Sequence, residues 1–290
     1  MTAPAVPCRR AEVRAALRAL GARPSRRLGQ NFLVDPGTLD RVAAAAGARE
    51  GDLVLEVGAG LGGLTERLAA SGAEVAAVEI DPALAGFLRA AFADEPRVKV
   101  VEADALDGKG GLSEEVRAAI DDGRAGQARP LRVAANLPYS IATPLLRALL
   151  LRDPPPRDLV IMVQREVADR IAAVPGTGAY GPLSVLVQCL ARVRRLLPVP
   201  ARAFHPVPEV SSAVLRVTPD AALRAAAGDA GRLERVVHAA FGTRRKTLAN
   251  ALEKAGLDGG LPGRAGLDGR RRAESLSPAE FVALAKAEGG

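Results

Sequence analysis

Short apolar runs that alternate with helical stretches from residue 52 onward constrain the fold of this chain more than any other feature. Strands with helices between them predict parallel pairing, because parallel neighbours need a crossover connection. Two later runs have no long helix between them and predict an antiparallel pair at one edge of the sheet. The pattern predicts an α/β, Rossmann-like fold with a doubly wound, mostly parallel sheet. Its seven predicted strands cover residues 53–57, 74–80, 97–103, 131–136, 157–164, 192–200 and 212–217.

The pattern changes near Pro219, where the β-type runs stop and helical periodicity takes over. We therefore expect a domain of residues 1–218, which carries the sheet and a basic N-terminal arm, and a small all-helical domain of residues 219–290. Ser277 is the predicted N-cap of the last helix. Two segments are predicted loops, namely an insertion at 107–130 with room for one short helix and a proline-rich connector at 152–158.

The composition excludes several classes of protein. With 48% hydrophobic residues the chain can bury a sizeable core, yet no apolar run approaches the roughly 18 to 20 residues of a membrane span. The first residues lack the apolar segment of a secretory signal, so we expect a cytoplasmic protein that does not engage a membrane. Two cysteines and two histidines indicate neither a disulfide framework nor a metal site.

Positive charge gathers in two places. The chain has 40 Lys and Arg against 33 Asp and Glu, a net charge of +7, although a GC-rich coding sequence also produces an arginine excess. Seven arginines lie within residues 1–35, and Arg244, Arg245 and Lys246 follow one another in a helical pattern. Such clusters are typical of surfaces that bind the phosphates of a nucleic acid, with a solvated helix face as the alternative.

The segment LEVGAGLGGLTERLA, residues 55–69, is predicted to be a strand, a glycine turn and a helix. Glycines let the backbone turn sharply and approach a ligand, and the helix N-terminus supplies unpaired N–H groups. Gly58, Gly60 and Gly63 satisfy the dinucleotide pattern G-x-G-x-x-G, which alone is a weak signal. A tight connection without a ligand is the alternative. If a cofactor binds, Gly58 and Gly60 are predicted contacts.

Three carboxylates at consecutive strand ends narrow the choice of cofactor. Glu79 ends the second predicted strand, where an acidic side chain in this fold accepts hydrogen bonds from ribose hydroxyls. Glu56, two residues before Gly58, would repel a pyrophosphate but suits the cationic amino-acid end of S-adenosylmethionine. Asp104, after the third strand, is placed to accept from the amine of the cofactor's adenine. We predict S-adenosylmethionine, although each acid alone is also what a solvated strand end contains.

The fourth predicted strand ends in VAANLPYS, residues 133–140. In a doubly wound sheet this end lies across the crevice from the glycine turn, where ligands bind. If the side-chain oxygen of Asn136 and the carbonyl of Leu137 or Pro138 accept the two N–H protons of an adenine amine, the nitrogen is aimed at a methyl group. Such positioning contributes on the order of 7 to 11 kcal/mol. Tyr139 offers an aromatic face to the target base, with an Asx-type turn and a packed tyrosine as the alternative.

Together these motifs resemble those of the ribosomal RNA adenine dimethylases. N-L-P-Y with E-x-G-x-G upstream is similar to the adenine amino-methyltransferases in general, and the resemblance is greatest to the bacterial enzymes of the small ribosomal subunit. It runs from about residue 10 to 286, with a longer insertion at 107–130 and with Glu209 where a lysine is common. Further motifs occur in the family's order: LGQNFLVD (28–35), VQREVADRI (163–171), YGPLSVLVQ (180–188), FHPVPEVSSAVLRV (204–217) and FGTRRKTLANAL (241–252).

The resemblance implies a class I methyltransferase fold and assigns roles residue by residue. Phe204 becomes a second aromatic flank for the extruded target base, opposite Tyr139, with ordinary core packing as its alternative. Arg244, Arg245 and Lys246 would meet RNA phosphates. The implied cofactor contacts are Asn31, Leu33, Gly58, Glu79, Asp104 and Asn136, of which Asn136 also serves the target amine.

The implied activity is N6-dimethylation of two adjacent adenosines near the 3′ end of 16S rRNA. The expected methyl donor is S-adenosylmethionine, and the expected partner is 16S rRNA in an immature 30S subunit, bound by a monomer. Three alternatives stay open: a 23S rRNA adenine methylase that confers antibiotic resistance, a ribosome assembly factor in which methylation is secondary, and a nicotinamide dehydrogenase.

Overall fold

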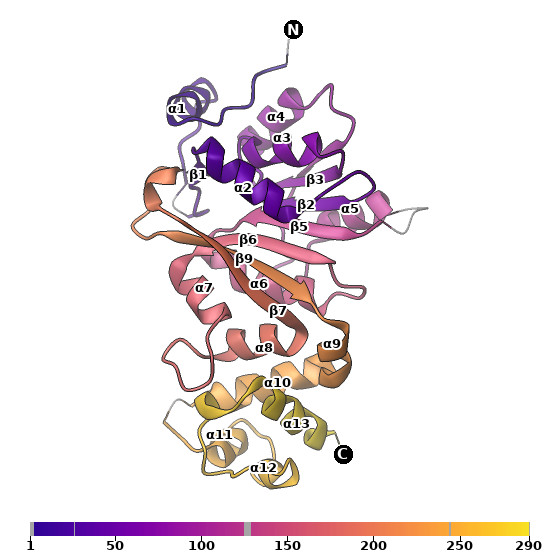
Figure 1. Ribbon diagram of the computed structural model, residues 1–290, viewed down its shortest axis with the longest axis vertical. Coiled ribbons are helices and arrows are strands. Elements are labelled where there is room, and N and C mark those ends of the chain that lie inside the picture. The colour runs from indigo at the N-terminus through magenta and orange to yellow at the C-terminus, as the bar shows by residue number, and fades with distance from the viewer. Residues whose placement is uncertain (1–2, 26, 125–128, 244, 290) are drawn as a thin grey trace. The chain divides into compact units, whose positions relative to one another are not determined.

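The computed structural model describes residues 3–25, 27–124, 129–243 and 245–289 of the 290-residue chain, with only the backbone described at Tyr139 (Figure 1). The strands are β1 Phe32–Leu33, β2 Leu53–Val57, β3 Glu74–Glu79, β4 Val98–Glu102, β5 Leu131–Asn136, β6 Asp158–Gln164, β7 Ala191–Val199, β8 Phe204–His205 and β9 Ser212–Pro219. The α-helices are α1 Arg10–Ala19, α2 Pro36–Ala46, α3 Gly63–Ala70, α4 Pro82–Ala91, α5 Glu114–Arg124, α6 Tyr139–Leu151, α7 Arg165–Ile171, α8 Pro182–Leu190, α9 Ala221–Ala227, α10 Ala230–Phe241, α11 Leu248–Lys254, α12 Leu261–Arg264 and α13 Pro278–Glu288.

A seven-stranded sheet has the order β4-β3-β2-β5-β6-β9-β7. The pairs from β4 to β6 are parallel, and β9 pairs with β6 in the antiparallel sense. The predicted doubly wound sheet with an antiparallel edge is confirmed, and the strand bounds agree within two residues. The chain runs outward from β2 to β4 and then returns to β5 beside β2. This reversal creates a switch point between β2 and β5, where ligands bind in such folds.

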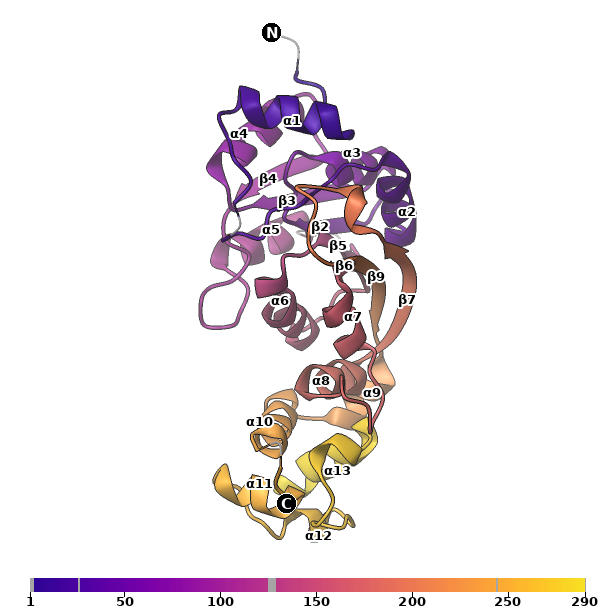
Figure 2. The same ribbon diagram turned by 90° about the vertical axis from the view of Figure 1, so that its left-hand side faces the viewer.

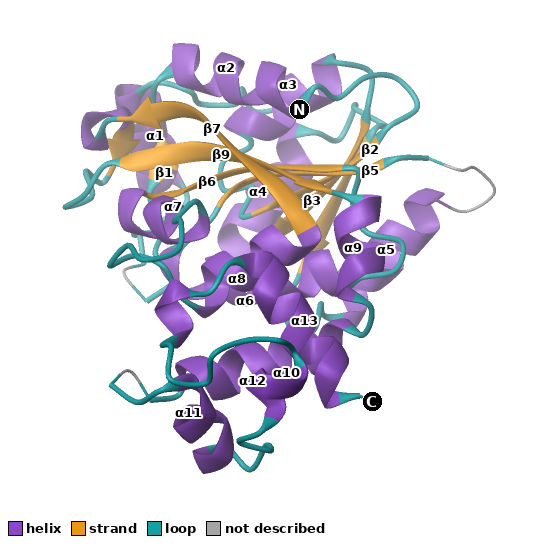
Figure 3. Cartoon of the chain, turned by 60° about the horizontal axis from the view of Figure 1, so that its bottom comes forward, coloured by secondary structure: helices purple, strands orange, loops and turns teal. Residues whose placement is uncertain are grey.

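Helices cover both faces of the sheet, with α2 and α3 on one face and α5 and α6 on the other (Figure 3). Because both faces are covered, the central strands are mostly apolar, and all five residues of β2 are buried, Glu56 among them. Local chemistry sets the helix ends. In α2, Asp35 accepts from the N–H of Thr38 at 3.0 Å, Pro36 follows it, and Gly47 closes the helix in the left-handed conformation.

A second, two-stranded sheet joins β1 to β8. Phe32 pairs with His205 and Leu33 with Phe204, and the Val34 N–H donates to the Ala203 carbonyl at 2.7 Å. The sequence did not predict this pair of strands, because a strand of two residues is too short to show an alternation of apolar and polar residues. It brings the segment around Asn31 to the segment around Phe204.

Residue contacts divide the chain into two compact units. One contains residues 1–165 and 195–217, and the other contains residues 166–194 and 218–290. Residues 166–194 thus belong with the helical unit, in contrast to the predicted division at 218. The physical reason is α8, whose apolar side packs on α9, α10 and α13 and could be mistaken in sequence for a crossover helix.

The helical unit has its own core, and Figure 2 shows α8, α10 and α13 side by side. The rings of Phe241 and Phe281 stack with centroids 5.6 Å apart, and the hydroxyl of Tyr180 donates to the Leu276 carbonyl at 2.8 Å. Ser277 caps α13 as predicted, since its hydroxyl accepts from the Glu280 N–H. Within the described ranges, no helix is long and apolar enough to cross a membrane.

The basic cluster after α10 does not continue a helix. The helix α10 ends at Phe241 and α11 begins at Leu248, so Arg245 and Lys246 lie in the turn between them, while Arg244 lies outside the described residues. The predicted helical pattern is therefore wrong here. Gly242 follows α10 directly, and glycine is a poor helix former, while Thr247 stands at the N-cap of α11.

Candidate active site

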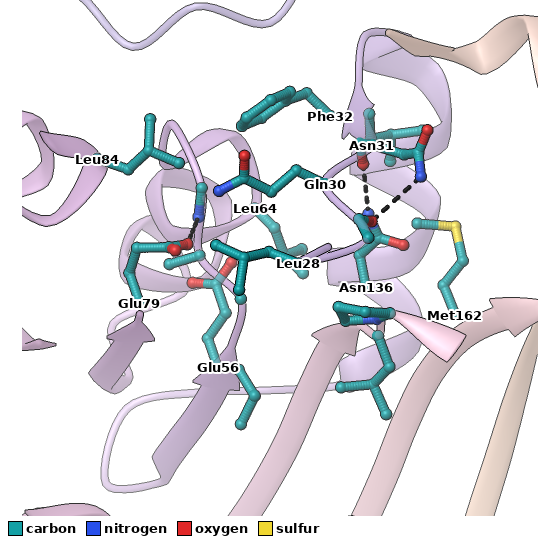
Figure 4. A pocket seen from close by; sticks show the side chains of 18 of the residues that line it. Leu28, Gln30, Asn31, Phe32, Glu56, Leu64, Glu79, Leu84, Asn136 and Met162 are labelled. Atoms are coloured by element: carbon teal, nitrogen blue, oxygen red, sulfur yellow. Dashed lines mark hydrogen bonds between the residues drawn. The ribbon is translucent and has the colours of Figure 1, made fainter. Parts of the chain in front are cut away.

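A cavity of about 380 Å³ opens in the first unit at the C-terminal ends of β2, β3, β5 and β6 (Figure 4). Its walls are the glycine turn after β2, the ends of β3 and β5, and the segment of residues 27–33, which includes β1. Its volume falls within the roughly 300 to 1,000 Å³ of small-molecule sites. The cavity thus occupies the switch point that the strand order creates.

The glycine turn forms one wall of the cavity. Gly58, Gly60 and Gly62 have φ angles of 77°, 60° and 84°, a left-handed region that side chains with a Cβ rarely adopt. A Cβ on Gly60 would lie 3.3 Å from the ring of Phe32. The turn can therefore bend sharply from β2 into α3 and still let the segment before β1 approach closely.

Glu79 ends β3 and is held by backbone N–H groups on both sides. The Gly60 N–H donates to its Oε2 at 2.8 Å, and the Asp81 N–H donates to its Oε1 at 2.9 Å. The side chain is 4% exposed, and this burial raises its pKa above the ordinary value, against the effect of the two hydrogen bonds. Glu79 therefore presents a fixed acceptor to the cavity.

Glu56 is the most buried carboxyl group of the site, at 2% exposure. The hydroxyl of Thr65 on α3 donates to its Oε2 at 2.6 Å. Burial raises the pKa of Glu56 to about 8, and the nearby charge of Glu79 adds to the shift. A cation in the cavity would stabilise the charged forms of both carboxyl groups, whereas the negative charge of a pyrophosphate would destabilise these forms.

Asn136, at the end of β5, lies on the opposite side of the cavity. Its side-chain NH₂ donates to the backbone carbonyl of Asn31 at 3.0 Å, and the side chain of Asn31 donates to the Gly29 carbonyl at 3.1 Å (Figure 4). A carboxamide whose NH₂ is engaged in this way directs its oxygen elsewhere as an acceptor. The carbonyl of Pro138 accepts from the N–H groups of Ile141 and Ala142 in the first turn of α6.

The other predicted site residues fall into four groups. Asp104 is exposed at the cavity wall and accepts from the Leu106 N–H at 3.0 Å, and Leu33, Leu137 and Pro138 also line the cavity. Phe204 lines the cavity but is only 2% exposed and packs in the main core. The side chain of Tyr139 lies outside the description. Arg245 and Lys246 are exposed in the helical unit and take no part in the cavity.

Sequence reasoning missed several residues that organise the site. Thr65 fixes Glu56, Gly29 touches Pro138, and Gln30 donates to Asp81 at 3.2 Å. Only Gln30 and Gly29 had a signal, because both lie in the segment LGQNFLVD that resembles a family motif. The partner of Thr65 depends on how α3 returns over β2, which no local pattern reports.

The residues at the cavity fit S-adenosylmethionine. Two buried carboxyl groups suit a ligand with positive charge, Glu79 has the position of a ribose acceptor, and Asp104 offers an exposed acceptor at the end of the next strand. A dinucleotide would place its pyrophosphate near Glu56, which is electrostatically unfavourable when that carboxyl group is ionised.

Several known proteins are similar to this chain in sequence. A family model described as ribosomal RNA adenine dimethylase matches residues 22–287. The chain is 44% identical over 279 residues to the ribosomal RNA small subunit methyltransferase A of Geobacter metallireducens, across 93% of this chain and 98% of the relative. It is 43% identical over 264 residues to the protein of the same name from Pseudomonas putida, across 91% and 94%.

Two solved structures are similar to this chain in fold. The 23S rRNA methyltransferase ErmE is similar with a TM-score of 0.62 and 28% identity, across 90% of this chain and 100% of that one. A dimethyladenosine transferase from Plasmodium falciparum is similar with a TM-score of 0.69 across 86% and 94%, and at 22% identity it supports the fold alone.

Proposed function

The chain belongs to the ribosomal RNA adenine dimethylase family, and on this basis we propose that it dimethylates the N6 amines of two adjacent adenosines near the 3′ end of 16S rRNA. The proposed substrate is the immature 30S subunit, and the proposed active form is a monomer. Support comes from relatives named small subunit methyltransferase at 43–44% identity over nearly their whole length.

The observation that carries the proposal is the placement of Asn136 across the cavity from Glu79 and Glu56. S-adenosylmethionine, when bound, supplies a methyl group on a positively charged sulfur. Glu79 would hold its ribose hydroxyls, Asp104 its adenine amine and Glu56 its cationic amino-acid end. Asn31, Leu33, Gly58 and Gly60 line the same cavity and would complete the contacts.

Asn136 and the main chain after it would hold the target amine. An adenine amine is a weak nucleophile because its lone pair is delocalised into the ring. With the Asn136 NH₂ engaged by Asn31, the Asn136 oxygen is presented as an acceptor for one amine proton. The Leu137 carbonyl is better suited than that of Pro138 to accept the other, because the Pro138 carbonyl already accepts two helix N–H groups. Held this way, the nitrogen needs no strong base.

RNA must bring the target base out of its stack before it can reach the cavity. We propose Tyr139 and Phe204 as its aromatic flanks, and Arg244, Arg245 and Lys246 as phosphate contacts. For Phe204 this role requires the ring to use the small part of its surface that faces the cavity, since most of it is packed in the core.

Mapping of methylated adenosines tests the proposed function. Primer extension or mass spectrometry of 16S RNA, from cells with and without this gene, should show dimethylation of two adjacent adenosines only when the gene is present. Methylation of 23S RNA would instead support the alternative that this protein is a 23S rRNA adenine methylase, as its likeness to ErmE suggests. Restoration of ribosome assembly by an inactive variant would support an assembly factor in which methylation is secondary.

A further inference from the structure

We propose that Gly29 is a positioning residue for methyl transfer. It lets residues 27–31, here called the strap, dock on Pro138, so that the carbonyl of Asn31 holds the Asn136 carboxamide with its oxygen toward the target amine. This inference rests on the proposed function, because it concerns the orientation of the group that would hold the substrate.

The contact between Gly29 and Pro138 leaves no room for a side chain. Gly29 has a φ of 62°, and a Cβ built on it would lie 2.9 Å from the Cβ of Pro138 and 3.6 Å from its Cα. Real Cβ atoms do not approach other carbons this closely, and the proline ring cannot rotate away. Any larger residue at 29 would therefore push the strap off the N-L-P-Y turn.

The strap sets which way the Asn136 carboxamide faces. Its NH₂ and its oxygen are similar in size, so packing alone does not distinguish the two orientations. The Asn31 carbonyl does, because it can only accept, and it lies 3.0 Å from the NH₂ nitrogen. In the opposite orientation the NH₂ would meet the adenine amine, donor against donor. The hydrogen bond from the Asn31 side chain to the Gly29 carbonyl stabilises the turn that places the Asn31 carbonyl next to Asn136.

The other side of the strap is tied to the cofactor end of the cavity. The side chain of Gln30 accepts from the Ser25 N–H at 2.8 Å and donates to Asp81 at 3.2 Å. Asp81 in turn donates its N–H to Glu79 and caps α4. One short segment therefore contacts the proposed target-amine acceptor directly and the proposed ribose acceptor through Asp81, so a shift of the strap should disturb the target end more than the cofactor end.

Gly29→Ala and Gly21→Ala form a matched pair of variants. Both glycines have a φ of 62°, so alanine introduces the same backbone strain at each, but nothing lies within 4 Å of a Cβ on Gly21. Single-turnover methylation of immature small subunits, at saturating S-adenosylmethionine, should be about 100-fold slower for Gly29→Ala, the cost of a displacement near 1 Å in an active site. The rate of Gly21→Ala should match that of wild type. For Gly29→Ala, calorimetry should show that the affinity for S-adenosylmethionine falls by a smaller factor than the rate of methyl transfer.

If Gly29→Ala reacts at the wild-type rate once saturated with cofactor, or if Gly21→Ala is equally slow, the positioning role is wrong. A measurement that does not depend on catalysis distinguishes failure of the positioning role from failure of the proposed function. The chain has three asparagines, and Asn250 is exposed on α11, so its side-chain NH₂ protons provide an internal reference for hydrogen exchange by NMR. The Asn136 NH₂ should exchange more slowly than that of Asn250 in wild type and in Gly21→Ala. It should exchange faster in Gly29→Ala.

Wild-type exchange at Asn136 as fast as at Asn250 would overturn the proposal even if Gly29→Ala did not fold. A wild-type protein that shows the slow exchange but leaves the RNA unmethylated would instead count against the proposed function and leave the role of the strap intact.

Discussion

The two ends of the cavity hold their polar groups in different ways. At the cofactor end, Glu79 accepts from Gly60 and Asp81, which belong to the loops that directly follow β2 and β3. At the target end, Asn136 donates to Asn31, which lies 105 residues earlier in the chain. The first arrangement forms whenever the sheet forms, whereas the second also needs the strap to dock. Cofactor affinity and methyl transfer should therefore be separable by mutation.

The largest expected effect is at the target end. Asn136→Ala should lower the rate of methyl transfer by about 10³-fold, the loss typical of removing one positioned polar group from an active site. Cofactor affinity should fall less than about tenfold, because a neutral hydrogen bond contributes only about 1 kcal/mol. Single-turnover kinetics and calorimetry measure the two effects, with Asn250→Ala as the control. Equal losses of rate and affinity would remove the distinction between the two ends.

Glu79→Gln should weaken cofactor binding more than it slows methyl transfer, the reverse of the effect expected for Asn136→Ala. It removes the charge of a buried acceptor, and hydrogen bonds to charged groups contribute about 1.5 to 3 kcal/mol, so the Kd for S-adenosylmethionine should rise about 10- to 100-fold. The rate at saturating cofactor should fall less than it does for Asn136→Ala. Glu102→Gln is the matched control, because Glu102 pairs with Glu79 in the sheet register but is exposed and outside the cavity. A wild-type Kd for Glu79→Gln would contradict the ribose assignment.

The cofactor end should also respond to pH through Glu56. Because its folded-state pKa is raised from 4.5 to about 8, the folded protein keeps a proton that the unfolded chain loses above pH 4.5. This contribution to the free energy of unfolding is complete below pH 4.5 and is lost as pH rises through 8. Urea unfolding of Glu56→Gln at several pH values in this window should therefore give a flatter profile than wild type.

The same proton links Glu56 to the ligand. A cation in the cavity favours the ionised carboxylate, so wild-type affinity for S-adenosylmethionine should rise with pH in this window, by at most about tenfold per pH unit for one proton. Calorimetry at several pH values should show a weaker dependence for Glu56→Gln. Identical pH profiles for the two proteins would show that Glu56 does not face the ligand.

The smallest effect is expected outside the cavity. Replacing Arg245 and Lys246 together by alanine should weaken RNA binding at every sequence and reduce the slope of log affinity against log salt by about 1 for each lost phosphate contact. Cofactor affinity should stay the same. The double replacement of Lys254 and Lys286 removes the same charge from exposed positions of the same unit. If both double variants lose RNA affinity equally, net charge rather than a specific site is responsible.

The central strands β2, β3, β5 and β6 were predictable because each is a mostly apolar run whose residues are nearly all buried. The C-terminal ends of the parallel strands then placed Glu56, Glu79, Asp104 and Asn136 at one crevice. What could not be predicted depends on distant contacts. The pairing of β1 with β8, the bond from Thr65 to Glu56 and the contact of Gly29 with Pro138 leave no periodic trace. The place of α8 in the helical unit was missed for the same reason.

Phe204 illustrates a different limit. Its sequence context suggested an aromatic flank, and it does line the cavity, but most of its surface is packed in the core. A motif indicates which residues gather at a site, not how much of each side chain is accessible. The same holds for Arg245 and Lys246, which are exposed as expected but lie in a turn rather than on a helix.

The most direct test is a crystal structure of this protein with S-adenosylhomocysteine and an adenosine nucleotide bound together. We expect the Asn136 oxygen and the Leu137 carbonyl to lie within hydrogen-bonding distance of the N6 nitrogen, with the Asn136 NH₂ still bound to the Asn31 carbonyl. A structure in which Asn136 faces away from N6, or in which its NH₂ rather than its oxygen is directed at the base, would contradict the proposed mechanism.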